Sequence, residues 1–197
     1  MSECGLKRIY ALENLKHLTF GIVESSSQLF SLEISFLFSR EYLYTLESLA
    51  RYNIHLSEDD CANIDKMQSI RILNLYNCSG LACHSRHIFA GIRNHLICID
   101  LLLHYRPGYA LFWDISMLRT LEHLQIDCGI ENVVPIEYTC PLTCLGRLES
   151  LILNLAITDD FLIHSSRSLL QLQRLALGDC THLSNESMCH IVNMRSL

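Results

Sequence analysis

The sequence has no run of apolar residues long enough to cross a membrane. Its longest apolar tract, residues 96–103, is interrupted by Asp100 and is far shorter than the roughly 20 residues that a transmembrane helix needs. The tract favours a buried strand instead. The N-terminus mixes charged side chains with apolar residues spaced every three positions, which is unlike a signal peptide. We therefore expect no membrane partner.

Basic residues are also scarce. The chain has 15 Lys and Arg against 21 Asp and Glu, and its formal net charge is −6. Sequence-independent binding to nucleic acid needs a basic face that neutralises phosphates. We therefore expect no nucleic-acid partner.

Motifs of common enzyme classes are missing. The sequence contains neither the G-x-S-x-G turn that carries a nucleophilic serine nor a glycine-rich loop that could hold phosphates. We therefore expect a protein that is not an enzyme and that holds no cofactor.

Cysteine, in contrast, is abundant. The ten cysteines are scattered along the chain and lack the regular spacing of a disulfide framework in a short secreted protein. We predict free thiols, which favours a cytoplasmic or nuclear location because thiols stay reduced there.

A leucine pattern recurs along nearly the whole chain. Its best copy is residues 169–180, which read L-x-x-L-x-x-L-x-L-x-x-C, and near copies lie at residues 67–78, 118–126 and 145–153. Self-similarity with a period in the twenties is typical of leucine-rich repeats, in which each unit is a strand followed by a helix or turn. The pattern predicts an α/β solenoid, with a curved parallel sheet on the concave face and short helices and loops on the convex face.

The first core residue of each predicted strand sets the register of seven units. These residues are Leu18, Leu49, Leu73, Ile99, Leu124, Leu151 and Leu175. Five of the six steps between them are 24 to 27 residues long. In the second unit Arg51 stands where a second core leucine is expected. We predict one domain over residues 1–197, with an irregular insert at 25–40 and the pattern cut mid-repeat at both ends.

Helix-start chemistry recurs after several strands. Ser57, Thr158 and Ser184 each precede acidic residues, so a hydroxyl can cap free amides while the acids offset the helix dipole. Between residues 133 and 144, Pro135 and Pro141 disfavour a regular helix, and the sequence predicts a loop.

The units resemble the cysteine-containing class of leucine-rich repeat, as found in F-box and leucine-rich-repeat proteins. That class reads L-x-L-x-x-C-x-x-I-T-D-x-x-L. The matching residues here are Leu175, Leu177, Cys180, Leu183, Ser184, Asn185 and Met188. Partial matches lie at residues 151–162 and 73–78, and the resemblance covers roughly residues 43–197.

This resemblance implies a substrate receptor of a cullin-RING ubiquitin ligase, in which F-box helices bind an adaptor and the repeats hold the substrate. We find no F-box before the repeats, because the repeat pattern begins by about Leu6. A cullin adaptor would therefore bind through a region absent from this chain. The alternative is a leucine-rich-repeat scaffold or regulatory protein unrelated to ubiquitin.

A protein partner is expected on the concave face. Strand side chains alternate, so the neighbours of each core residue point out of the core and form one surface. The predicted partner-binding residues are His17, Thr19, Ser48, Tyr52, Asn53, Asn74, Tyr76, Asn77, Asp100, His123, Gln125, Asp127, Ser150, Asn154, Arg174 and Asp179.

Tyr52 and Tyr76 occupy equivalent positions in successive units. We expect their side chains to lie roughly 5 Å apart as neighbours in the sheet. Paired tyrosines suit a protein-binding hot spot, because tyrosine offers a large contact area at modest entropy cost. The alternative is a tyrosine ladder that only stabilises the sheet.

Other positions on this surface also have two interpretations. Asp100, Asp127 and Asp179 could attract a basic partner, or they could be scattered solvated acids. Leu102 and Leu103 are interpreted as buried contacts rather than as part of a binding surface.

Four residues near the third unit could in principle hold zinc, which needs four ligands in a closed tetrahedron. They are Cys78, Cys83, His84 and His87. Because the repeat pattern uses Cys78 in the core and the two histidines fit the start of a helix, we expect no metal. Cys78 and Cys180 are interpreted as small apolar residues whose S–H groups reach backbone carbonyls.

Overall fold

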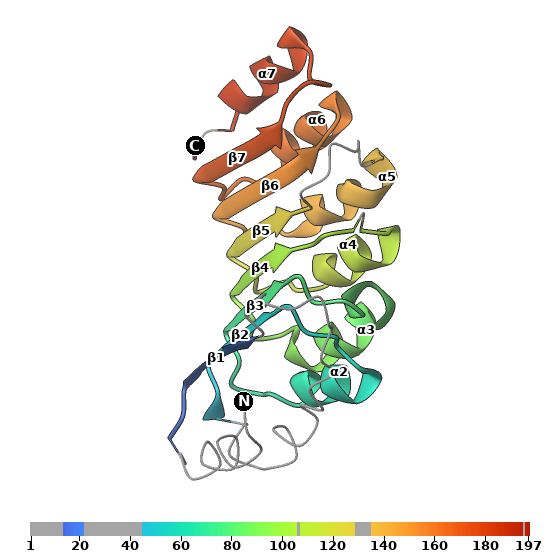
Figure 1. The fold of residues 1–197 in the computed structure, drawn as a ribbon. Helices are drawn as coiled ribbons and strands as arrows, with labels where there is room; N and C mark the ends of the chain where they lie inside the picture. The colour runs from blue at the N-terminus through green and yellow to red at the C-terminus, as the bar shows by residue number, and fades with distance from the viewer. Residues whose placement is uncertain (1–13, 22–44, 106, 129–134, 195) are drawn as a thin grey trace.

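The computed structural model describes residues 14–21, 45–105, 107–128, 135–194 and 196–197. These residues form one open sheet of seven parallel strands, whose order in the sheet is their order in the sequence. Helices alternate with the strands and lie on one side of the sheet (Figure 1). The fold is therefore α/β, and it is compatible with a solenoid of strand–helix units.

The strands are β1 (His17–Gly21), β2 (Ser48–Tyr52), β3 (Ile72–Tyr76), β4 (Cys98–Leu102), β5 (His123–Asp127), β6 (Ser150–Ala156) and β7 (Arg174–Asp179). The helices are α2 (Glu58–Asp65), α3 (Leu81–Ile92), α4 (Tyr109–Ser116), α5 (Ile136–Thr139), the 3-10 helix η3 (Cys140–Cys144), α6 (Asp159–Ser168) and α7 (Asn185–Val192).

The predicted register is confirmed by the strand pairing. The first core residues lie side by side in one unbroken row, Leu18, Leu49, Leu73, Ile99, Leu124, Leu151 and Leu175. The backbone before each strand repeats as well. The carbonyl of Glu47 accepts hydrogen bonds from the amides of Arg71 at 2.8 Å and Ile72 at 3.1 Å, and Arg71 accepts in the same way from the next unit.

The core lies between the sheet and the helices. The second and fourth residues of the central strands point inward, and Leu73, Leu75, Leu151 and Leu153 are fully buried. The helices bury the opposite wall, as α3 does with a stripe of one residue per turn that includes Ile88. Units that cannot bury their apolar side alone are thus joined into one continuous core.

Arg51 occupies the inward position that an apolar residue fills in the other units. Its side chain is fully buried, and its Nη2 lies 3.7 Å from Oδ1 of Asp60 in the first turn of α2. The guanidinium also lies 5.0 Å from the centre of the Phe20 ring on β1. Burial lowers the pKa of Arg51, while the charge of Asp60 opposes that shift. The buried charge is therefore compensated by an acid and an aromatic ring from neighbouring elements.

Two of the three predicted helix caps form as expected. Ser57 and Asp60 make a reciprocal capping box at α2, and Ser184 accepts a hydrogen bond from the amide of Ser187 at 3.2 Å at α7. Thr158 occupies the position before α6, but its hydroxyl accepts no hydrogen bond from that helix. The cap predicted for Thr158 is therefore wrong in its hydrogen bond and correct in its position.

The loop predicted between residues 133 and 144 is wrong within the described part of that segment. Residues 136–144 form α5 and η3. Pro141 lies in the first turn of η3, where a helix has no use for the missing amide, so proline is tolerated there. The predicted insert at residues 25–40 and the start of the pattern near Leu6 lie outside the described residues.

Among the described residues, no helix combines the length and the apolar composition that a membrane span requires.

Leu124 tests the register directly, because it is the first core residue of β5 and is 1% exposed. We expect Leu124→Ala to lower the free energy of unfolding by about 2–5 kcal/mol, since it removes buried methyl groups and leaves a cavity. Urea denaturation measures this change. Gln125→Ala, at the neighbouring position that points out of the core, is the matched control and should cost less than about 0.5 kcal/mol. Equal costs for the two variants would contradict the register.

Candidate functional site

The first, third and fifth residues of the strands point away from the helices and form what we call the open face. The predicted partner-binding residues on these positions are His17, Thr19, Ser48, Tyr52, Asn74, Tyr76, Asp100, His123, Gln125, Asp127, Ser150, Asn154 and Arg174. Asn53 and Asn77 directly follow β2 and β3, and Asp179 ends β7. None of these residues is buried, so the structure brings the predicted set to one side of the sheet.

The prediction missed some members of the open face. Ile72 and Cys98 occupy the first positions of β3 and β4, and Ile72 is 36% exposed. Ala50 and Ala176 occupy third positions. The register could have placed these residues on the open face, since each first position directly precedes a core residue. They are apolar, however, and so do not stand out in the sequence as surface residues.

Tyr52 and Tyr76 stack on the open face. Their ring centroids are 4.6 Å apart and the rings are inclined by 20°, which confirms the expected spacing. The Tyr76 hydroxyl donates a hydrogen bond to Oδ2 of Asp100 on the next strand. Tyr52, Tyr76 and Asp100 thus form a continuous row across β2, β3 and β4, which we call the tyrosine–aspartate row.

Burial raises the pKa of both residues that form this hydrogen bond. Burial raises the pKa of Tyr76, and the bond to Asp100 raises it further. Burial also raises the pKa of Asp100, while donation from Tyr76 lowers it and the charge of Asp127 raises it. The hydrogen bond therefore favours a neutral tyrosine beside an ionised aspartate at neutral pH.

Two asparagines form a second ladder beside the tyrosines. Nδ2 of Asn77 donates to Oδ1 of Asn53 at 3.0 Å. Both residues have a positive φ, 54° at Asn53 and 53° at Asn77, a conformation that asparagine tolerates better than most residues. The backbone N–H of each asparagine also donates a hydrogen bond to a carbonyl oxygen of the next strand, as Asn53 does to Tyr76 at 2.9 Å. The turns after β2 and β3 are thus fixed in the same conformation.

The acidic residues of the open face do not act as one group. Asp100 and Asp127 lie on adjacent strands, and Nδ2 of Asn154 donates to Asp127 at 2.9 Å. Asp179 instead accepts hydrogen bonds from the backbone and side chain of Thr181, and these bonds lower the pKa of Asp179. The carboxylate of Asp179 therefore belongs to the turn after β7, and the acidic character lies on β4 and β5.

The interpretation of Leu102 and Leu103 is half correct. Leu103 is fully buried. Leu102 is only half-buried, and it lies at the fifth position of β4 beside Tyr76 on the open face. The interpretation of Leu102 as a buried contact is wrong, because the last residue of the strand keeps the outward direction set by the alternation.

The two cysteines singled out in the sequence differ in burial. Sγ of Cys78 is buried and lies 3.6 Å from the carbonyl oxygens of Arg51 and Tyr76, as expected. Sγ of Cys180 lies 3.8 Å from the carbonyl oxygen of Leu177, as expected, but unlike Cys78 this residue is exposed. β7 lies at the edge of the described sheet, where no strand covers this turn. The nine cysteines that the structure describes are free thiols.

The residues considered for zinc do not converge on a site. His84 and His87 lie in the first two turns of α3, as expected from the sequence, and Cys83 lies in the first turn. The rings of His84 and His87 are 6.4 Å apart, and His87 lies 4.0 Å from Glu58. Within the described part of the chain, no group of three or more His, Cys, Asp or Glu side chains could hold a metal ion.

No protein-family model matches the chain, and no curated protein matches it significantly. The functional interpretation therefore depends on the residues of the open face.

Tyr76→Phe tests the tyrosine–aspartate row. Removing the hydroxyl removes a donor that stabilises the ionised carboxylate, so we expect the pKa of Asp100 to rise further above its ordinary value of 3.8. Carboxyl-carbon NMR shifts recorded against pH measure this change. Tyr52→Phe is the matched control, because the structure gives the Tyr52 hydroxyl no bond to Asp100, and it should leave the pKa of Asp100 unchanged.

The same shift predicts a pH dependence of folding. The pKa of Asp100 is raised in the folded state, so its contribution to stability is present below pH 3.8 and is lost as the pH rises through the folded-state pKa. Tyr76→Phe should widen the pH range over which this contribution is lost, since it raises the folded-state pKa of Asp100. Equal pH profiles for Tyr76→Phe and Tyr52→Phe would contradict the row as described.

Proposed function

We propose that this protein is a non-enzymatic recognition module, a leucine-rich-repeat solenoid that binds a protein partner on its open face. The observation that carries the proposal is the tyrosine–aspartate row, which joins a partly exposed aromatic pair to an acid on a face that no described helix covers. Seven parallel strands in register provide a rigid support for such a surface.

The exposure of Tyr52 favours partner binding over a purely structural ladder. Tyr52 is 38% exposed although its ring stacks on Tyr76. Stacking alone would stabilise the sheet. An exposed ring held in one orientation in addition offers a contact area that loses little entropy on binding.

The more specific role that we propose is the substrate-binding arm of an F-box type receptor of a cullin-RING ubiquitin ligase. Its support is the resemblance of residues 175–188 to the cysteine-containing repeat class. The adaptor would bind a region outside the present chain, and the substrate would occupy the open face. A scaffold or regulatory array without a link to ubiquitin is the alternative.

Affinity purification of the full-length protein separates these two roles. If the protein is a ligase receptor, we expect mass spectrometry to recover a cullin and its adaptor together with the substrate. Recovery of partners without either ligase component would favour the scaffold and contradict the ligase role.

The open face itself is tested with Tyr52→Ala and Tyr76→Ala, assayed against the partner recovered by purification. Each change removes a large aromatic contact, so we expect binding to weaken by about 2 kcal/mol, or roughly 30-fold in Kd. Because Tyr52 lies at the surface, Tyr52→Ala should cost little stability. Leu170→Ala, at a residue 70% exposed and off the open face, is the control. Unchanged affinity in both tyrosine variants would show that the partner binds elsewhere.

A further inference from the structure

Helix α4 carries an apolar stripe on its outer surface. Tyr109, Trp113 and Met117 follow one another every four residues, so they lie on one side of the helix. Their side chains are 43%, 46% and 42% exposed. They are among the largest apolar side chains that the described residues leave at the surface.

This stripe is not part of the buried core. The inner side of α4 already buries Leu111, Phe112 and Ile115 against the core. A surface helix ordinarily carries polar residues opposite its buried side, as α6 does with Asp160 and Arg167. Apolar side chains on the outer side of α4 therefore need an explanation other than the core.

The aromatic side chains of this region support one another. The rings of Tyr109 and Trp113 stack with centroids 6.0 Å apart, and Tyr138 from α5 meets the Tyr109 ring edge-on at 6.1 Å. Exposed rings that contact one another are held in place before any partner arrives, which reduces the entropy cost of binding.

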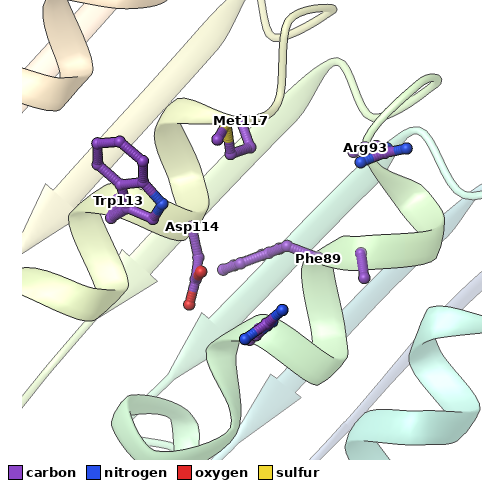
Figure 2. A pocket seen from close by; sticks show the side chains of 7 residues that line it. Phe89, Arg93, Trp113, Asp114 and Met117 are labelled. Atoms are coloured by element: carbon purple, nitrogen blue, oxygen red, sulfur yellow. The ribbon is translucent and has the colours of Figure 1, made fainter.

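A groove of about 400 Å³ runs between α4 and the preceding helix α3. Trp113 and Met117 line it from α4, and Phe89 extends toward it from α3 (Figure 2). Phe89 is 2% exposed, so the groove has an apolar floor. A volume of this size accommodates a few side chains, at the lower end of the range of ligand pockets.

Arginines border the groove on α3. Arg86 and Arg93 are exposed and lie seven residues apart, so they share one side of the helix about 10 Å apart along its axis. Among the described residues neither guanidinium forms an ion pair. Asp114 is the single carboxylate in the lining, and it is half-buried and accepts a hydrogen bond from Ser85 at 2.6 Å. The exposed charge along the groove is therefore positive, on a chain whose formal net charge is −6.

We propose that the groove between α3 and α4 is a second docking site, which takes an acidic segment of a partner protein. An apolar side chain of that segment lies over Phe89 between Trp113 and Met117, and its carboxylates bind Arg86 and Arg93. Tryptophan, methionine and arginine are the residues enriched at the centres of protein interfaces. Arginine also binds carboxylates with paired hydrogen bonds. This site lies on the helix side of the sheet and does not depend on the function proposed for the open face.

Trp113 provides a direct measurement, because it is the single tryptophan of the chain. The probe is a short synthetic peptide, capped at both ends, with a central Phe-Leu pair flanked by Asp and Glu. Two further peptides replace the acids with Asn and Gln or with Lys. Titration of the full chain with the acidic peptide should shift Trp113 emission to shorter wavelength and reach saturation, and the affinity should fall as salt is added.

Variants assign the binding to the groove. Arg86→Gln combined with Arg93→Gln should weaken binding of the acidic peptide by about tenfold, through loss of charge complementarity. Arg71→Gln combined with Arg167→Gln removes the same charge from exposed positions outside the groove and should leave affinity within about twofold. Met117→Gln should also weaken binding of the acidic peptide, because it replaces an apolar contact with a polar side chain. Circular dichroism confirms that each variant is folded.

Several results would overturn the assignment. They are an absence of saturable change in Trp113 emission with the acidic peptide, equal affinity for the uncharged or the basic peptide, or an equal loss in the two arginine double variants. Binding of an RNA oligonucleotide at Arg86 and Arg93 without binding of the acidic peptide would assign the groove to another class of partner and contradict this one. Tyr52→Ala should leave the peptide titration unchanged, so failure at this site and failure at the open face are distinguished.

Discussion

Every feature of this molecule depends on the in-register stacking of one position from strand to strand. The row that runs from Leu18 to Leu175 places each core residue against its equivalent in the next unit. Because strand side chains alternate, a shift of one residue would exchange the core with the open face. The same row therefore fixes the apolar interior, the position of the tyrosine–aspartate row and the direction in which each helix leaves the sheet.

Arg51 is an exception to the apolar interior that this register produces. A charge stands at an inward position of β2, and the fold keeps it there by bringing Asp60 from α2 and Phe20 from β1 against it. Removing a charge from water is costly, and the acid and the ring both offset part of that cost. This one departure from the leucine pattern thereby brings side chains from two strands and a helix into contact.

The two proposed surfaces differ in charge and lie on opposite sides of the sheet. The open face presents Asp100 and Asp127 beside stacked tyrosines, whereas the groove between α3 and α4 presents Arg86 and Arg93 beside Trp113. Surfaces of opposite charge repel each other's partners, so each would select its own. A protein with two such faces could hold two partners at once.

The sequence by itself determined the strand register, most of the core and most members of the open face. Leucine spacing and side-chain alternation are local properties, and they are visible without knowledge of how the units meet. The stacking of Tyr52 on Tyr76 followed from that register alone. Three other features were decided only by the tertiary structure: the bond from Tyr76 to Asp100, the exposure of Cys180 and the groove between α3 and α4. Their geometry depends on rotamers and helix packing that no local pattern encodes.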